Sequence, residues 1–141
     1  MPLGHIGINV DDLGAARRYF DGLMPLVGYE EFFSTEDEFS YRPVDGKVGT
    51  FLFFYPSADP GDYSRLRPGL QHLAFIVKTR DKVHAAHDSA LTSGCEIVHA
   101  PREFPEYHPG YYATFWLDPF GHMIEVVCHR DPSSGGSPLG D

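Results

Sequence analysis

The sequence predicts an α+β protein in which two paired βαβββ modules form a curled mixed sheet around a cleft. Two observations lead to this fold class. The apolar phrase HIGINV at residues 5–10 returns about half the chain later as HLAFIV at residues 72–77. The strand and helix periodicities that follow each phrase come in the same order in both halves. A duplicated unit is the simplest explanation of both observations.

The first module begins with alternating apolar and polar residues, which is typical of a strand. Asp11 and Asp12 are suited to cap the helix that follows, and Pro25 ends it. Asp45-Gly46 favours a tight turn, because both residue types tolerate a positive φ. The predicted elements are a strand at 3–10, a helix at 13–23, and strands at 29–33, 39–42 and 50–55.

The second module repeats this order after a linker at 56–68 that is rich in Pro and Gly. Gly94 stands where a helix commonly ends, and Asp118-Pro119-Phe120-Gly121 favours a turn between two strands. Three prolines at 101–110 indicate a loop. The predicted elements are a strand at 71–77, a helix at 80–93, and strands at 96–99, 111–117 and 122–128.

These modules, at about 3–56 and about 69–129, are expected to form one domain over residues 1–130. Each predicted sheet has an apolar face that its own helix does not cover, so two modules are expected to pair. Residues 131–141 are rich in Ser, Gly and Pro, which predicts a disordered tail.

Composition narrows the classes of partner and the cellular location. A net charge of −9 and a pI of about 5.2 argue against a nucleic-acid surface. The sequence has neither a long apolar stretch nor the pattern of a signal peptide, so we expect no membrane contact. Two cysteines outside any Cys-x-x-Cys pair fit a reduced, cytoplasmic protein.

His5, His72 and Glu125 are the candidate metal ligands. The two histidines open equivalent predicted strands, and Glu125 interrupts the apolar run MIEVV. A carboxylate inside such a strand is costly unless a cation or a hydrogen bond compensates it. Two imidazoles and one carboxylate are a recurring divalent-metal set that leaves positions open for substrate. The alternative is two hydrogen-bonded strand histidines and an outward-facing Glu125.

The repeated modules, the two histidines and the stretch Asp-Pro-x-Gly-x-x-x-Glu at 118–125 resemble the vicinal oxygen chelate superfamily. That superfamily includes glyoxalase I, fosfomycin-resistance enzymes, methylmalonyl-CoA epimerase, extradiol dioxygenases and bleomycin-binding proteins. The resemblance spans about residues 3–129. It implies that His5, His72 and Glu125 hold one divalent metal (Fe, Zn, Ni, Mn or Co). It also implies a small-molecule substrate and a homodimer.

Two departures from this resemblance bear on the reaction. Glyoxalase I has a fourth protein ligand, and alignment of Gly49 with Gly121 puts Phe53 at the position of Glu125. Extradiol dioxygenases carry a tyrosine where this sequence has Phe115. The leading hypothesis is therefore a glyoxalase-like lyase or isomerase that stabilises an enolate or oxyanion. The alternatives are an extradiol-type Fe(II) dioxygenase and a non-catalytic, bleomycin-type binding protein, for which the acidic balance suits a cationic ligand.

The candidate catalytic residues are Glu125 and His108. Imidazole titrates near neutral pH, so His108 could carry a proton close to the metal. The alternative is that His108-Pro109-Gly110 is only a turn with an exposed ring. The tyrosines around it, Tyr107 and Tyr111, are expected to form core or pocket wall.

Overall fold

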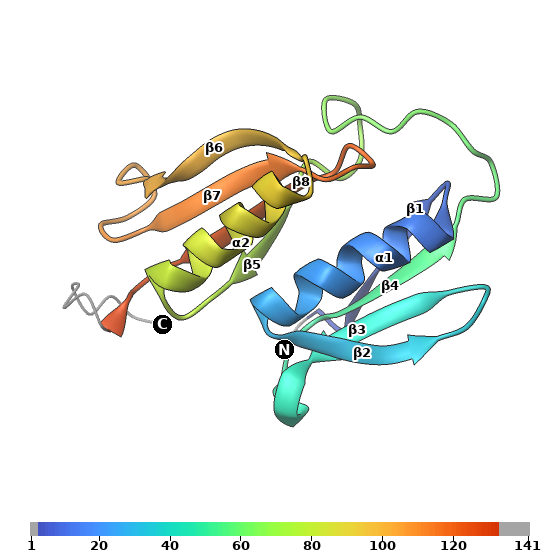
Figure 1. Cartoon of the computed structure of the whole chain (residues 1–141), viewed down its shortest axis with the longest axis horizontal. Helices are drawn as coiled ribbons and strands as arrows, with labels where there is room; N and C mark the ends of the chain where they lie inside the picture. The colour runs from blue at the N-terminus through green and yellow to red at the C-terminus, as the bar shows by residue number, and fades with distance from the viewer. Residues whose placement is uncertain (1–2, 133–141) are drawn as a thin grey trace. The chain divides into compact units, whose positions relative to one another are not determined.

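The computed structural model describes residues 3–132 and divides the chain into two compact units, Met1–Asp62 and Tyr63–Asp141. The predicted α+β class is confirmed, because each unit holds one four-stranded mixed sheet and one α-helix (Figure 1). Most of the predicted tail, residues 133–141, lies outside the described residues. Asp131 is buried, and its carboxylate accepts a hydrogen bond from the Arg80 backbone N–H at 2.8 Å.

The first unit has the sheet order β1-β4-β3-β2, in which only β1 and β4 run parallel. Its elements are β1 His5–Val10, α1 Leu13–Leu23, the short 3-10 helices η1 Met24–Val27 and η2 Val44–Gly46, β2 Tyr29–Ser34, β3 Phe39–Pro43 and β4 Phe51–Pro56. Asp12 is the predicted cap, since its carboxylate accepts from the Ala15 N–H at 2.9 Å. Helix α1 packs Phe20 against Phe54, with ring centroids 4.5 Å apart.

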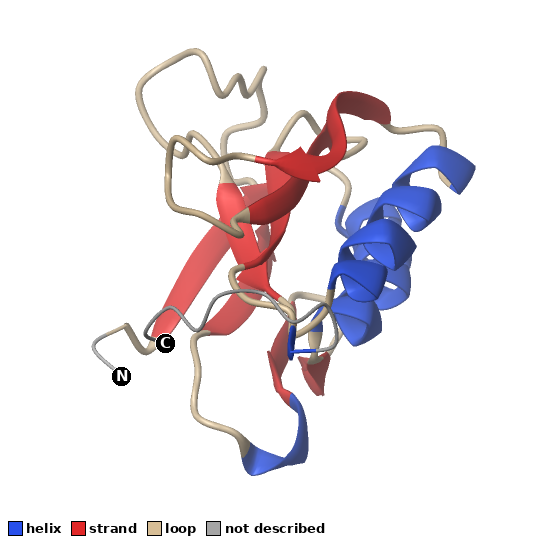
Figure 2. Cartoon of the chain, turned by 90° about the vertical axis from the view of Figure 1, so that its left-hand side faces the viewer, coloured by secondary structure: helices blue, strands red, loops and turns tan. Residues whose placement is uncertain are grey.

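The second unit repeats the arrangement with the order β5-β8-β7-β6, and only β5 and β8 run parallel. Its elements are β5 Leu73–Ile76, α2 Arg80–Thr92, β6 Glu96–Glu103, β7 Tyr112–Leu117 and β8 Met123–Cys128. In each unit the helix lies against one face of its own sheet (Figure 2). Neither α-helix of the described residues is long and apolar enough to cross a membrane.

Strand β6 is longer than the sequence predicted. It continues through Pro101 to Glu103, where a loop was expected from residue 101 onward. β6 is the edge strand of its sheet, and its pairing with β7 shifts register between Ile97 and His99 and again between His99 and Arg102. Proline lacks a backbone N–H, so a bulged edge strand is where a sheet tolerates it. Pro101 therefore did not exclude a strand, whereas Pro105 and Pro109 lie in turns after β6, as predicted.

Candidate functional site

The candidate site lies on the face of the second sheet that α2 does not cover. Side chains alternate along a strand, so Ile124 and Val126 face one side of β8 and Met123, Glu125 and Val127 face the other. Met123 and Val127 belong to an apolar cluster on that second side. Glu125 stands between them and is only 2% exposed. The chain therefore keeps a carboxylate within an apolar surface, as the sequence predicted.

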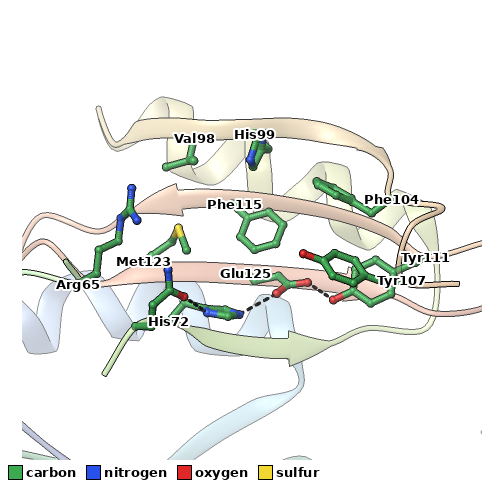
Figure 3. A pocket seen from close by; sticks show the side chains of 11 residues that line it. Arg65, His72, Val98, His99, Phe104, Tyr107, Tyr111, Phe115, Met123 and Glu125 are labelled. Carbon is green, nitrogen blue, oxygen red and sulfur yellow. Dashed lines mark hydrogen bonds and ion pairs between the residues drawn. The ribbon is translucent and has the colours of Figure 1, made fainter. Parts of the chain in front are cut away.

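His72 is the charged or polar side chain nearest to one Glu125 oxygen. Its Nε2 lies 3.2 Å from Glu125 Oε1 (Figure 3). On the other side of the ring, Nδ1 contacts the side-chain oxygen of Gln71. That oxygen only accepts, so Nδ1 carries a hydrogen. A neutral His72 then points a lone pair at Glu125 Oε1, and two acceptors this close need a proton or a metal cation between them.

Tyr111 holds the second Glu125 oxygen, because its hydroxyl donates to Oε2. Burial, and next the hydrogen bond and charge of Glu125, raise the pKa of Tyr111 well above its ordinary value of 10.0. The phenol therefore stays protonated and remains a donor through the whole range of physiological pH. Glu125 is fixed on one oxygen by Tyr111 and directs the other oxygen at His72.

Replacing Tyr111 with Phe is expected to lower the free energy of unfolding of chelator-treated protein by about 1 kcal/mol, the usual net value of a hydrogen bond. The raised folded-state pKa means that this stabilisation is present below the unfolded pKa and is lost as pH rises through the folded pKa. The difference between wild type and Tyr111→Phe should thus be constant from neutral pH to about pH 9 and shrink above about pH 10. Urea unfolding across pH measures it.

Tyr107→Phe is the matched control, because it removes a neighbouring hydroxyl from a residue that is 62% exposed. It should change the free energy of unfolding by less than about 0.5 kcal/mol. Equal losses in the two variants would show that the hydroxyl of Tyr111 has no special role.

A pocket of about 470 Å³ surrounds the carboxylate. Its wall combines apolar side chains with a few polar groups, the usual make-up of a small-molecule site. Phe115 forms much of the floor, with its ring 6.0 Å from His72 and 5.5 Å from His99. The lining residues are Arg65, Gln71, His72, Val98, His99, Phe104, Tyr107, Tyr111, Phe115, Met123 and Glu125.

His108 does not line this pocket. Its Nδ1 lies 2.9 Å from the Pro109 carbonyl and its Nε2 lies 3.0 Å from His129 Nδ1. The carbonyl only accepts, so a neutral His108 carries its hydrogen on Nδ1 and accepts from His129. Burial, and next the neighbouring His108, lower the pKa of His129 below 6.5. Both ring nitrogens of His108 are thus engaged away from Glu125, although its ring contacts Tyr111.

The first unit repeats the backbone of this site with different chemistry. The parallel register pairs His5 with Phe51, so Phe53, two residues further along β4, takes the place that Glu125 has in β8. The Phe53 ring meets His5 edge to face at 5.2 Å. An aromatic contact therefore replaces the histidine–carboxylate contact of the second unit. Among residues 3–132 the structure gathers no three His, Cys, Asp or Glu side chains into one metal-binding group.

Comparison with known proteins assigns the family. Residues 2–126 match the model of the Glyoxalase/Bleomycin resistance protein/Dioxygenase superfamily. The chain belongs to this superfamily. The resemblance noted in the sequence is thereby confirmed at the level of the family, which hosts several reactions on one fold.

The chain is similar to one curated protein and to several solved structures. The uncharacterized protein YqjT of Bacillus subtilis is 28% identical over 126 residues, which cover 87% of this chain and 95% of YqjT. A solved structure of a provisionally named glyoxalase from Bacillus halodurans has a TM-score of 0.75 and 30% identity, with 90% of this chain and 95% of that one covered. The fosfomycin resistance protein FosX of Listeria monocytogenes, solved with Mn(II) and sulfate, has a TM-score of 0.63 and 20% identity, with 89% and 88% covered. At this identity, the likeness to FosX shows a common fold and nothing more.

Two residues of this candidate site were missed or misplaced in the sequence, and the contact of a third was not foreseen. Arg65 lies in the segment interpreted as a linker, where no periodicity exists to place a side chain. Gln71 was assigned to a strand, but β5 begins at Leu73 and leaves Gln71 beside His72. Tyr111 lines the pocket, as expected, and its hydroxyl in addition contacts Glu125. A buried carboxylate needs a hydrogen-bond donor. That rule predicts a donor close to Glu125 but does not say which residue provides it.

Proposed function

We propose that this chain is a metal-dependent enzyme of the lyase or isomerase type that acts on a small molecule bound through its oxygens. The observation that carries the proposal is the pair of atoms His72 Nε2 and Glu125 Oε1, which face each other at 3.2 Å in a pocket wall. Membership of the superfamily supports the proposal, because the set of metal ligands was inferred from a resemblance to this same superfamily.

The donor set fits a divalent cation. Imidazole nitrogen and carboxylate oxygen suit Fe, Zn, Ni, Mn and Co, and we propose His72 and Glu125 as two ligands and His5 of the first unit as the third. Gln71 on His72 Nδ1 and Tyr111 on Glu125 Oε2 are the outer contacts that orient such ligands. When bound, the metal would supply a positive charge that stabilises a developing enolate or oxyanion.

The chain's own residues position the substrate and the proton carrier. Phe115, Phe104 and Met123 cover the pocket wall beside Glu125 and keep bulk water from it, which strengthens electrostatic interactions there. The Tyr111 hydroxyl donates to Glu125 Oε2 and orients the carboxylate. His108 stays the proposed proton carrier; since its nitrogens contact Pro109 and His129, it would exchange its proton through the His129 ring.

Elemental analysis of the untreated protein tests the proposal. We expect about one divalent metal per chain, and loss of most of it in His72→Ala and in His5→Ala. His87→Ala is the matched control, because His87 lies on α2, where its Nδ1 is 3.3 Å from Asp88 Oδ1. Wild-type metal content in both His72→Ala and His5→Ala would remove the basis of the proposal.

The metal found also separates the alternative reactions. Iron together with oxygen uptake on catechols would favour the extradiol-type dioxygenase, and a metal-free protein that binds a ligand in chelator would favour the bleomycin-type binding protein. The homodimer and the cytoplasmic location stay predictions, which sedimentation and cell fractionation can check.

A further inference from the structure

The pocket of the second unit has one positively charged side chain besides the histidine–carboxylate pair. Arg65 is the single Lys or Arg among the lining residues. It is half-buried, and within residues 3–132 its guanidinium has neither a hydrogen bond nor an ion pair. An unpaired planar fork of donors is suited to a carboxylate, which it binds through two parallel hydrogen bonds.

Between Arg65 and the tyrosines the wall is mostly apolar and aromatic, with His99 as a polar member. Val98, Phe104, Phe115 and Met123 line this stretch, and the Phe104 and Phe115 rings meet at 5.4 Å. Figure 3 shows Arg65 and Met123 at one end, Tyr107 and Tyr111 at the other, and Glu125 between them. Aromatic walls favour a planar ring in stacked or edge-to-face contact. The pocket therefore has the Arg65 guanidinium at one end and the phenols at the other, with the apolar wall and the Glu125 carboxylate between them.

We infer that the pocket binds aryl carboxylates, with the aromatic ring on the Phe104–Phe115 wall and the carboxylate on Arg65. The inference opposes the preference that net charge suggests, because an acidic chain attracts cations at long range. Among residues 3–132 no carboxylate pairs with Arg65, whereas Glu125 already has His72 and Tyr111 as partners. The anion is thus selected locally. The inference concerns ligand binding alone. Only the statement that a reaction takes place in this pocket rests on the proposed function.

Binding of 3-phenylpropionate and of its neutral amide, 3-phenylpropionamide, tests the inference by NMR titration of ¹⁵N-labelled, chelator-treated protein. In wild type the acid should bind about tenfold more tightly than the amide, as one charge-assisted contact allows. Arg65→Gln should abolish this preference, whereas Arg67→Gln, the same charge change in the same loop, should keep it. Phe115→Leu should weaken both compounds alike and leave their ratio unchanged, and its spectrum reports whether the variant is folded.

Equal binding of acid and amide to wild type, an acid preference that survives Arg65→Gln, or no saturable shifts with either compound would overturn the inference. Because metal is removed throughout, these outcomes are independent of the metal content that tests the proposed function. A protein that never binds metal can still show the Arg65-dependent preference, and a metal-loaded enzyme can lack it.

Discussion

Glu125→Gln is expected to lower the affinity for divalent metal by at least about 100-fold, more than outer contacts of a metal site usually contribute. The substitution keeps the shape of the side chain and removes the anionic oxygen that faces His72. It should leave the metal-free protein almost as stable as wild type. The amide oxygen can still accept from Tyr111, and the amide N–H can donate to the His72 Nε2 lone pair.

Two measurements separate these effects. Competition with a fluorescent chelator gives the metal affinity, and urea unfolding with excess chelator gives the stability, which we expect to change by less than about 1 kcal/mol. Glu103→Gln is the matched control, since it makes the same charge change on β6 at a side chain that is 57% exposed. Wild-type metal affinity in Glu125→Gln would exclude this carboxylate as a ligand, whatever happens to stability.

Asp118→Ala is expected to destabilise the second unit by about 3 kcal/mol, as removal of a buried, hydrogen-bonded charge does. The Asp118 side chain is buried in the turn between β7 and β8. Its Oδ1 accepts from the backbone N–H groups of Phe120 and His122, each at 2.9 Å, and its Oδ2 lies 2.8 Å from His122 Nδ1. Alanine would leave all three donors without this acceptor.

Trp116 gives a direct measurement of that loss. It is the one tryptophan of the chain, it is fully buried, and it lies two residues before Asp118. Its fluorescence during urea unfolding should show a lower midpoint in Asp118→Ala. Asp88→Ala is the control, because Asp88 also contacts a histidine but its side chain is 74% exposed; it should shift stability by less than about 0.5 kcal/mol. Similar midpoints in the two variants would mean that the turn does not depend on the carboxylate.

The sequence predicted the elements of the fold because their signals are local. Alternation identified β1, and an apolar run identified β8. Helical spacing and the Asp12 cap identified α1, and the positive φ of Asp45 and Gly46 matches the predicted turn. The extent of β6 was wrong because a bulged edge strand admits Pro101. Proline argues against a strand only where the ladder needs its N–H.

The candidate site was predictable where repetition supplied a second signal. His72 and Glu125 stood out because one recurs with His5 and the other interrupts an apolar strand, and the structure brings these two together. Arg65 could not be predicted, since it reaches the pocket from a segment without periodicity. The residue that Tyr111 contacts depends on the register between β7 and β8. The turn at Asp118 fixes that register, and it does so only in the folded structure.

The edge strands of the second sheet affect how readily the protein self-associates at high concentration. The edge strand β6 is interrupted by two register shifts and a proline. The other edge strand, β5, is only four residues long. Neither offers a long straight row of vacant peptide groups, which is what a neighbouring molecule needs to extend a sheet. The protein can therefore keep an apolar ligand pocket and the 68%-exposed Ile76 on its surface with little tendency to polymerise through backbone pairing.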